Sequence, residues 1–172
     1  MKNVIKMTDA TVKYKNHTIQ YYDLLDSGHN PDTQIRRGAI YTREDHQFES
    51  LVPHIPKGGV VYDIGAYIGT FSIPMALEGF DVIAFEGFPS NSKRATKNCS
   101  AYPSIDVHNV AVSNKTYEVK TKFNDCRDQG KREEDLIKYV ELDKYVKENN
   151  IPNPDFIKLD IEGMETVALF GM

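Results

Sequence analysis

Val60-Val-Tyr-Asp-Ile-Gly-Ala-Tyr-Ile-Gly-Thr-Phe-Ser72 is the stretch that decides the fold. Its first five residues are β-branched or aromatic apart from Asp63, as expected for a strand buried on both faces. Gly65 and Gly69 follow, and residues 70–77 have the pattern of a helix. The stretch therefore predicts a strand, a glycine turn and a helix, in which a ligand can approach the backbone and the N–H groups of the helix N-terminus point at an anion.

The spacing of the glycines distinguishes two classes of cofactor. The turn reads Asp-x-Gly-x-x-x-Gly, whereas dinucleotide-binding proteins have Gly-x-Gly-x-x-Gly, and Tyr67 stands where their second glycine approaches a pyrophosphate. A single carboxylate, such as that of a methionine moiety, needs less room. The spacing therefore favours S-adenosylmethionine over a nicotinamide dinucleotide. An ordinary tight strand-to-helix turn is the alternative.

Length and charge limit the classes of protein and partner. The chain has 172 residues, 40% of them hydrophobic, which suits one domain with a sizeable core. Its net charge of −4 gives no general basic field for nucleic acid or an anionic membrane, so neither is an expected partner. No apolar run is long enough to span a bilayer and the N-terminus lacks the core of a signal peptide. We therefore expect a cytoplasmic protein.

Cysteine and histidine spacing gives no sign of a disulfide framework or a metal site. Cys99 and Cys126 do not form a Cys-x-x-Cys pair, which predicts free thiols in a reducing compartment. The five histidines are scattered without metal-ligand spacing. Asp125 with Asp128 or Asp135 is better explained as a solvated charged loop, so no metal is predicted.

The chain changes character near residue 54. Residues 1–53 contain a predicted hairpin with its turn at 15–17 and a predicted helix over 43–52, and we interpret them as a cap. From residue 54 to 172 strand and helix patterns alternate, which predicts an α/β fold with a mostly parallel sheet covered by helices on both faces. The predicted strands are 60–64, 81–86, 105–112, 136–141 and 155–161, the helices 69–78, 90–101, 142–149 and 162–170, and residues 117–123 are predicted to pair as a hairpin.

Glu86 ends the second strand of this alternation. An acid at that place in a βαβ unit can accept hydrogen bonds from both ribose hydroxyls of a nucleoside. A carboxylate at a strand end can also be merely solvated. Asn109 and Ala111 follow the third strand, where the backbone could meet an adenine edge, an inference from position alone.

Candidate acid–base residues lie in the sequence Lys158-Leu-Asp160-Ile-Glu162-Gly163-Met-Glu165. Asp160 and Glu162 are expected to point the same way from a strand, because side chains repeat every two residues. There they could orient an acceptor hydroxyl, or take its proton as a methyl group transfers. The alternative is that acids are simply favoured in the first turn of a helix, which suits Glu165 best. The partner of Lys158 is left open.

With these residues assembled, residues 38–172 resemble the FkbM family of S-adenosylmethionine-dependent methyltransferases. The supporting stretches are residues 63–72, Phe85-Glu86-Gly87-Phe-Pro89, Asn98, 111–113, Leu142-Asp143 and 157–165. The resemblance implies a Rossmann-like class I methyltransferase fold and methyl transfer to oxygen, commonly a hydroxyl of a sugar, a polyketide or another secondary metabolite. The predicted cofactor-binding residues are Asp63, Gly65, Ala66, Tyr67, Gly69, Glu86, Asn109 and Ala111, and the predicted catalytic residues are Asp160 and Glu162.

The chain departs from the family pattern in three ways. Family members usually have Asn in place of Tyr67 and Pro in place of Gly87. The class I sheet also has seven strands in the order 3-2-1-4-5-7-6, whereas this chain ends after the fourth, so we expect the domain to be incomplete. The strand 155–161 is then an exposed edge. The N-terminal residues could cover that edge, or it could pair in a homodimer.

Two functions remain open at this point. The first is an S-adenosylmethionine-dependent O-methyltransferase acting on a hydroxyl of a sugar or small metabolite. The second is a truncated, non-catalytic nucleoside-binding or interaction module.

Overall fold

The computed structural model describes residues 7–25, 31–36, 48–121 and 135–172. The described residues up to His54 form one compact unit, and Ile55–Thr121 with Asp135–Met172 form a second. The role of residues 1–53 as a cap stays a prediction. Cys99 is a buried free thiol, as predicted, whereas Cys126, Asp125 and Asp128 lie outside the described residues. No helix within the described ranges is long and apolar enough to cross a membrane.

The first unit is built on the predicted hairpin. Strands β1 (Met7–Tyr14) and β2 (His17–Leu25) are antiparallel and meet at Tyr14 and His17. Helix α1 (Pro31–Arg36) follows, residues 48–51 are helical, and a 3₁₀ turn covers Val52–His54. The rings of Tyr14 and Phe48 meet edge to face with centroids 5.5 Å apart. The predicted helix over 43–52 is thus helical in its described part, and the rest lies outside the described residues.

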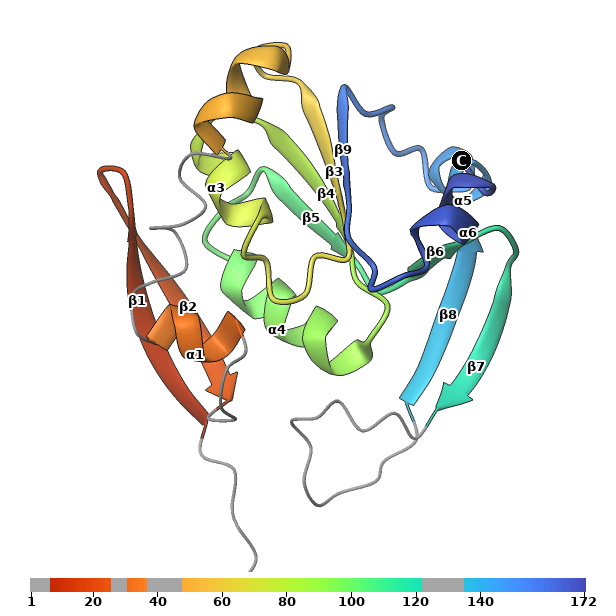
Figure 1. Cartoon of the computed structure of the whole chain (residues 1–172), viewed down its shortest axis with the longest axis horizontal. Coiled ribbons are helices and arrows are strands. Elements are labelled where there is room, and N and C mark those ends of the chain that lie inside the picture. The colour runs from red at the N-terminus through yellow and green to blue at the C-terminus, as the bar shows by residue number, and fades with distance from the viewer. Residues whose placement is uncertain (1–6, 26–30, 37–47, 122–134) are drawn as a thin grey trace, which may run out of the picture. The chain divides into compact units, whose positions relative to one another are not determined.

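The second unit contains the predicted parallel sheet (Figure 1). Its strands are β3 (Val60–Ile64), β4 (Asp81–Phe85), β5 (Ile105–His108) and β9 (Phe156–Leu159). They are all parallel and lie in the order β5-β4-β3-β9. This is the order 3-2-1-4 that the family resemblance implies. The carboxyl ends of all four strands therefore meet at one edge of the sheet.

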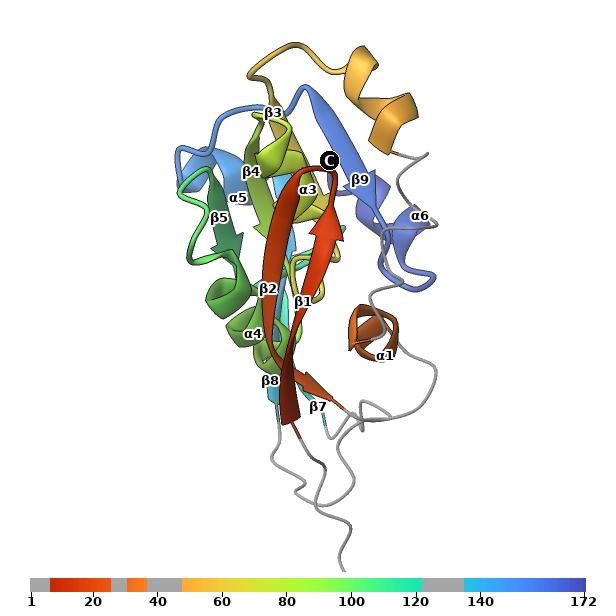
Figure 2. The same ribbon diagram turned by 90° about the vertical axis from the view of Figure 1, so that its left-hand side faces the viewer.

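Helices cover both faces of this sheet, as Figures 1 and 2 show. Helices α3 (Ser72–Leu77) and α4 (Pro89–Cys99) lie on one face, and α5 (Leu142–Glu148) and α6 (Glu165–Leu169) on the other. Alternate strand residues serve each face, because successive side chains in a strand point to opposite sides. The core on the α5 and α6 side is formed by Tyr62, Ile64, Ile83, Phe85, Val110, Val112, Val140, Leu142, Val146 and Ala168.

A second sheet corrects the predicted strand over 105–112. That stretch is two strands, because β5 ends at His108 and β6 (Ala111–Ser113) begins three residues later. The Val110 N–H donates to the His108 carbonyl oxygen at 3.0 Å, a tight turn that redirects the chain. Strand β6 then pairs in parallel with β8 (Asp135–Glu141), which pairs antiparallel with β7 (Tyr117–Thr121). The apolar pattern continues through the break, so periodicity alone does not reveal it.

Two helices are shorter than the sequence predicts. The helix expected over 69–78 begins only at Ser72, because residues 67–71 form turns. The helix expected over 162–170 begins at Glu165. In both places the missing first turn belongs to the loop at the carboxyl edge of the sheet. Gly79, with φ +93°, ends α3 as predicted, and its N–H donates to the Ala76 carbonyl oxygen.

Candidate functional site

Asp63 is a buried anchor at the end of β3. Its side chain is 0% exposed, and Oδ2 accepts a hydrogen bond from the Ser72 hydroxyl at 2.6 Å. Oδ1 lies 3.1 Å from the ammonium of Lys158. A buried carboxylate is costly unless it is paired and hydrogen-bonded, and Asp63 is both. It therefore ties β3 to the start of α3 and to β9.

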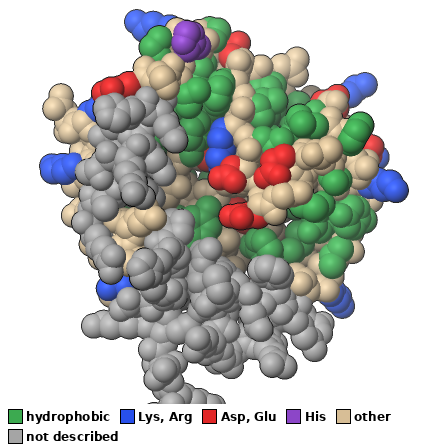
Figure 3. All heavy atoms as spheres, in the orientation of Figure 1, with side chains coloured by type: hydrophobic (Ala, Val, Ile, Leu, Met, Phe, Trp, Pro, Cys, Tyr) green, Lys and Arg blue, Asp and Glu red, His purple; other side chains and the backbone are tan. Residues whose placement is uncertain are grey.

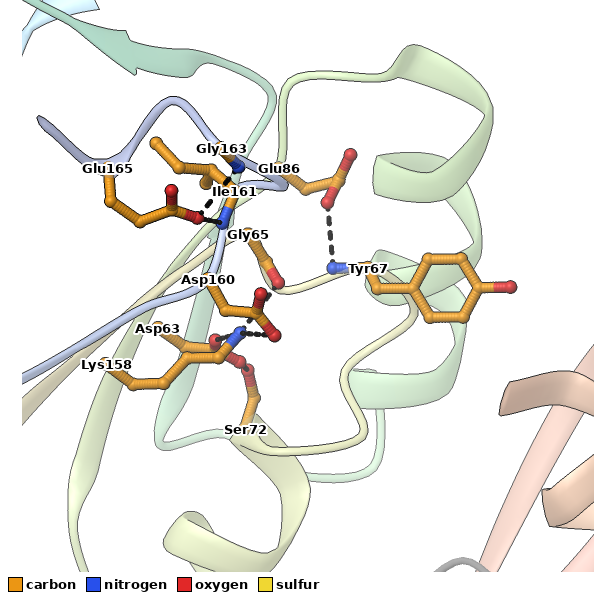
Figure 4. Close-up of polar contacts among 10 residues, drawn as sticks. All are labelled: Asp63, Gly65, Tyr67, Ser72, Glu86, Lys158, Asp160, Ile161, Gly163 and Glu165. Carbon is orange, nitrogen blue, oxygen red and sulfur yellow. Dashed lines mark hydrogen bonds and ion pairs between the residues drawn. The ribbon is translucent and has the colours of Figure 1, made fainter. Parts of the chain in front are cut away.

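Lys158 lies at this edge of the sheet, and its ion-pair partner, which the sequence leaves open, is Asp63. It is the register partner of Asp63 across the β3–β9 pair. Its Nζ also donates to the Gly65 carbonyl oxygen at 2.9 Å and lies 4.0 Å from Asp160 Oδ2. Figure 4 shows the ammonium between these three groups. A lysine in an otherwise apolar strand needs an acid beside it, which is the signal that could have identified this pair.

The two glycines of the turn are required by neighbouring protein atoms. Gly65 has φ +84°, and a Cβ there would overlap the carbonyl oxygen of Asp160. Gly69 has φ +88°, and a Cβ there would come within 2.7 Å of the Cys99 Sγ. Gly65 thus lets the end of β9 approach β3, and Gly69 lets α4 approach the turn. Their presence does not by itself require a ligand.

Most N–H groups of the turn already have acceptors within the protein. Those of Gly65 and Ala66 both donate to the Phe85 carbonyl oxygen, at 2.9 and 3.1 Å. The Tyr67 N–H donates to Glu86 Oε2 at 2.8 Å and the Gly69 N–H to the Ala66 carbonyl oxygen at 2.8 Å. These four N–H groups are therefore committed within the protein, and the prediction that the N–H groups of the helix N-terminus point at an anion stays a prediction.

Glu86 follows β4 directly and holds the turn to the start of α4. Besides Tyr67, it accepts the Phe88 N–H at 2.9 Å on Oε1. Burial of the side chain raises its pKa from 4.5 to about 7, against hydrogen bonds from Phe88 and Asn91 that lower it. The nearby charge of Asp63 raises the pKa further and that of Lys158 lowers it. Glu86 is thus a carboxyl group that titrates near neutrality.

Asn109 and Ala111 lie against the backbone that follows Glu86. The Asn109 side-chain amide donates to the carbonyl oxygens of Glu86 and Gly87, at 2.8 and 3.2 Å. A Cβ at Gly87 would come within 2.7 Å of the Ala111 Cβ. Both residues therefore shape the segment that presents Glu86. Their predicted contact with an adenine stays a prediction.

Asp160 and Glu162 do not share a strand, which corrects the expectation that they point the same way by alternation. Strand β9 ends at Leu159, and Glu162 has φ +56° in the turn that follows. The Asp160 side chain is 70% exposed and Glu162 is exposed. Glu165 Oε1 accepts the N–H groups of Ile161 and Gly163, at 2.9 and 3.2 Å, so it closes the turn (Figure 4).

The structure thus brings most of the predicted site residues to one edge of the sheet. Asp63, Gly65, Glu86 and Asp160 gather there with Lys158, and Figure 3 shows acidic side chains beside a basic one near the middle of that face. Ser72 and Lys158 are the participants that the sequence did not assign. Among the described residues, no group of three His, Cys, Asp or Glu side chains is arranged to hold a metal ion.

Comparison with known proteins identifies the family to which the chain belongs. Residues 63–171 match the family described as "Methyltransferase FkbM domain". The chain belongs to the FkbM methyltransferase family. The match begins at the buried anchor Asp63 and includes the whole turn, Glu86 and the segment from Lys158 to Glu165.

One curated relative and one solved structure are also similar to the chain. The chain is 25% identical over 128 residues to "Hexuronic acid methyltransferase AglP" of Haloferax volcanii, which covers 71% of this chain and 53% of that protein. The chain therefore spans about half the length of this relative. A crystal structure of a SAM-dependent methyltransferase from Agrobacterium tumefaciens aligns with TM-score 0.43 and 13% identity, over 64% of this chain and 34% of that one. At that TM-score the likeness adds nothing to the fold described above.

Tyr67 stands where the resemblance to the FkbM family leads us to expect Asn. Its φ is +55°, a left-handed conformation that Asn tolerates better than a bulky residue does. The conformation thus gives a physical reason for Asn in the family. The Tyr67 ring points away from the carboxylates in Figure 4, and the guanidinium of Arg94 lies 5.6 Å from its centroid. Tyr67 therefore does not crowd the group of acids.

Proposed function

We propose that this FkbM domain binds S-adenosylmethionine and transfers its methyl group to a hydroxyl oxygen of a sugar or another small metabolite. The observation that carries the proposal is the meeting of Glu86, the Asp63–Lys158 pair and Asp160 at the carboxyl ends of β4, β3 and β9. Open α/β sheets bind their ligands at this edge. Membership of the FkbM family supports the choice of methyl donor.

The charged and polar side chains at this edge fit a nucleoside attached to an amino acid. Glu86 accepts two backbone N–H groups and a side-chain hydrogen bond from Asn91, and an ionised carboxylate offers about four acceptor positions, so about one remains for a ribose hydroxyl. Lys158 and the exposed Asp160 present opposite charges beside it. Once bound, the methyl donor supplies an electrophilic methyl group on a sulfonium. The residues of the chain have to hold it in position and to accept the proton of the acceptor hydroxyl.

Glu162 and Asp160 are the groups that could accept that proton. Asp160 lies 4.0 Å from the Lys158 ammonium, which stabilises its negative charge and weakens it as a base. Among the described residues, the Glu162 side chain makes no hydrogen bond or ion pair, and it is exposed in the turn after β9. We therefore assign the general base to Glu162. The name of AglP, a hexuronic acid methyltransferase, supports a carbohydrate acceptor.

Calorimetry with S-adenosylhomocysteine tests the first half of this proposal. The wild-type chain should bind this product, and Glu86→Ala should bind it at least about tenfold more weakly, because hydrogen bonds to a charged group contribute roughly 1.5–3 kcal/mol. Glu118→Ala is the matched control, since Glu118 is an exposed acid on β7. No binding by the wild type at millimolar ligand would contradict the proposal.

Transfer of a labelled methyl group to a panel of uronic acids and neutral sugars tests the second half. Labelled product that disappears in Glu162→Gln, while S-adenosylhomocysteine still binds, would support Glu162 as the base. Donor binding without transfer to any acceptor would favour the non-catalytic module instead.

A further inference from the structure

The glycine turn offers few donors for the carboxylate of the methyl donor. The N–H groups of Gly65, Ala66, Tyr67 and Gly69 are all bound to protein acceptors. The Ser72 hydroxyl donates to Asp63. None of these five donors is available to an anionic group at this edge unless the group displaces an existing hydrogen bond.

Lys158 has a donor for such a group. An ammonium has three N–H groups, of which one donates to the Gly65 carbonyl oxygen at 2.9 Å. Asp63 Oδ1 lies 3.1 Å away as an ion-pair partner without a hydrogen bond, and Asp160 Oδ2 at 4.0 Å is too far for one. At least one N–H is thus not committed to these three groups. The side chain is 22% exposed, so a ligand can reach it.

Asp160 provides the opposite charge next to this donor. Its side chain is 70% exposed, whereas both oxygens of Asp63 are buried and already paired. An α-amino acid carries its ammonium and its carboxylate on neighbouring atoms of one carbon. A positive and a negative side chain 4.0 Å apart are complementary to that pair of charges.

We propose that Lys158 and Asp160 together bind the α-amino-acid end of the methyl donor, an inference that rests on the proposed function. Lys158 binds the carboxylate and Asp160 binds the ammonium. Asp63 is then the buried group that holds Lys158 in place, and it does not contact the ligand. Asp160, predicted as catalytic from the sequence, becomes a donor-binding residue and leaves the proton of the acceptor to Glu162.

Three ligands separate this inference from the proposed function in calorimetry. S-adenosylhomocysteine has the whole amino-acid end, its decarboxylated analogue has only the ammonium, and 5′-methylthioadenosine has neither. Lys158→Met and Asp160→Asn should each weaken the binding of S-adenosylhomocysteine by about tenfold or more, because the first removes a hydrogen bond to the carboxylate and the second removes the negative charge that faces the ammonium. Both should leave 5′-methylthioadenosine within about twofold of wild type, since no contact to the nucleoside is lost.

The decarboxylated analogue tests the assignment of charges within the pair. It should bind the wild type more weakly than S-adenosylhomocysteine does, and Lys158→Met should weaken it little further, because the two changes remove the same contact. Asp160→Asn should still weaken it by about tenfold. The assignment would be overturned if the decarboxylated analogue bound about tenfold more weakly to Lys158→Met and bound Asp160→Asn as tightly as it binds the wild type.

The outcomes are distinguishable. Binding of neither nucleoside by the wild type overturns the proposed function and this inference with it. Unchanged S-adenosylhomocysteine binding in both variants overturns the inference alone. An equal loss of both nucleosides in Lys158→Met shows a structural role for Lys158. Because Lys158→Met leaves Asp63 buried without its cation and could unfold the domain, Asp160→Asn, a change at an exposed side chain, tests the inference independently.

Discussion

Gly65 and Gly79 share a backbone conformation but not an environment. Their φ angles are +84° and +93°. A Cβ at Gly65 would overlap the Asp160 carbonyl oxygen, whereas a Cβ at Gly79 would meet nothing within 4 Å. The two positions therefore separate the cost of a left-handed conformation from the cost of a clash.

Alanine substitutions at these two glycines make the first prediction. Gly79→Ala should lower the free energy of unfolding by about 1–2 kcal/mol, the cost of placing a Cβ in a left-handed conformation. Gly65→Ala should cost roughly 1–3 kcal/mol more, because β9 has to move away from β3. Urea unfolding of both variants measures the difference. Equal losses would show that β9 does not pack against Gly65 as described.

Glu86 makes the folded state more stable at low pH, whereas most paired acids make it more stable at high pH. Its pKa is about 7 in the folded chain against 4.5 for the ordinary group, because the side chain is buried. The folded state therefore favours the protonated form. The stability it contributes is fully present below pH 4.5 and is lost as the pH rises through about 7.

Ligand binding should reverse this preference, which gives the second prediction. A ribose hydroxyl that donates to Glu86 favours the ionised carboxylate, so its pKa falls and a proton is released on binding. The affinity for S-adenosylhomocysteine should rise with pH by up to about tenfold per pH unit below 7 and level off above it. Calorimetry in buffers of different ionisation enthalpy counts the proton.

The Glu86→Gln variant is the control for the proton. It should bind with an affinity independent of pH across this range. A pH dependence of the wild type that persists in Glu86→Gln would assign the proton to another group.

At the scale of elements, the turn between β9 and α6 depends on one carboxylate. Glu162 and Gly163 both have positive φ, at +56° and +97°. A hydrogen bond from its own backbone N–H, followed by those from Ile161 and Gly163, lowers the pKa of Glu165. The turn holds Glu162, the proposed base, in a conformation that few residues adopt.

Glu165→Ala makes the third prediction. The amides of Ile161 and Gly163 should exchange with solvent faster, because each loses its acceptor. The matched control is Glu162→Ala, which removes a carboxylate from the same turn without removing an acceptor and should leave both rates nearly unchanged. In the wild type the protection should fall as the pH drops below 4.5, since a lowered pKa means that the ionised form stabilises the turn.

Much of the sheet follows from sequence patterns, and most of the rest depends on contacts between distant residues. The runs at 60–64 and 81–85 are short, apolar and β-branched, so they identify buried parallel strands. The break after His108 is different, because residues on either side of it are equally suited to strands. Which sheet each half joins depends on β8, more than twenty residues later.

In the candidate site, too, some residues are recognisable from the sequence and others depend on contacts between distant residues. Asp63 and Glu86 are recognisable because each follows or ends an apolar strand. The pairing of Lys158 with Asp63 requires knowing that β9 lies beside β3 and in which register. The occupied N–H groups of Gly65, Ala66 and Tyr67 are likewise invisible in the sequence, since their acceptors come from β4 and Glu86.

At the scale of the whole molecule, β9 lies at one edge of the four-stranded sheet in the described part of the chain. Among the described residues it pairs with β3 alone, and Ile157 within it is 39% exposed. Unpaired N–H and C=O groups on an apolar edge strand are a template for another strand. The homodimer expected through this edge remains a proposal, as does the interaction module that would use it.

Ile157→Lys makes the last prediction. We expect the wild-type chain to self-associate as its concentration rises, and a lysine on the edge to weaken that association, because a charge opposes strand pairing. Sedimentation velocity over a range of concentrations measures it. Leu169→Lys is the control, since Leu169 is 61% exposed and apolar but lies on helix α6 and not on an edge strand. Equal effects of both variants would indicate general apolar contact, and a wild type that stays monomeric would contradict pairing through β9. Selective loss in Ile157→Lys, with S-adenosylhomocysteine binding retained, would place association at the edge and separate it from the proposed donor site, because Ile157 contributes no group to that site.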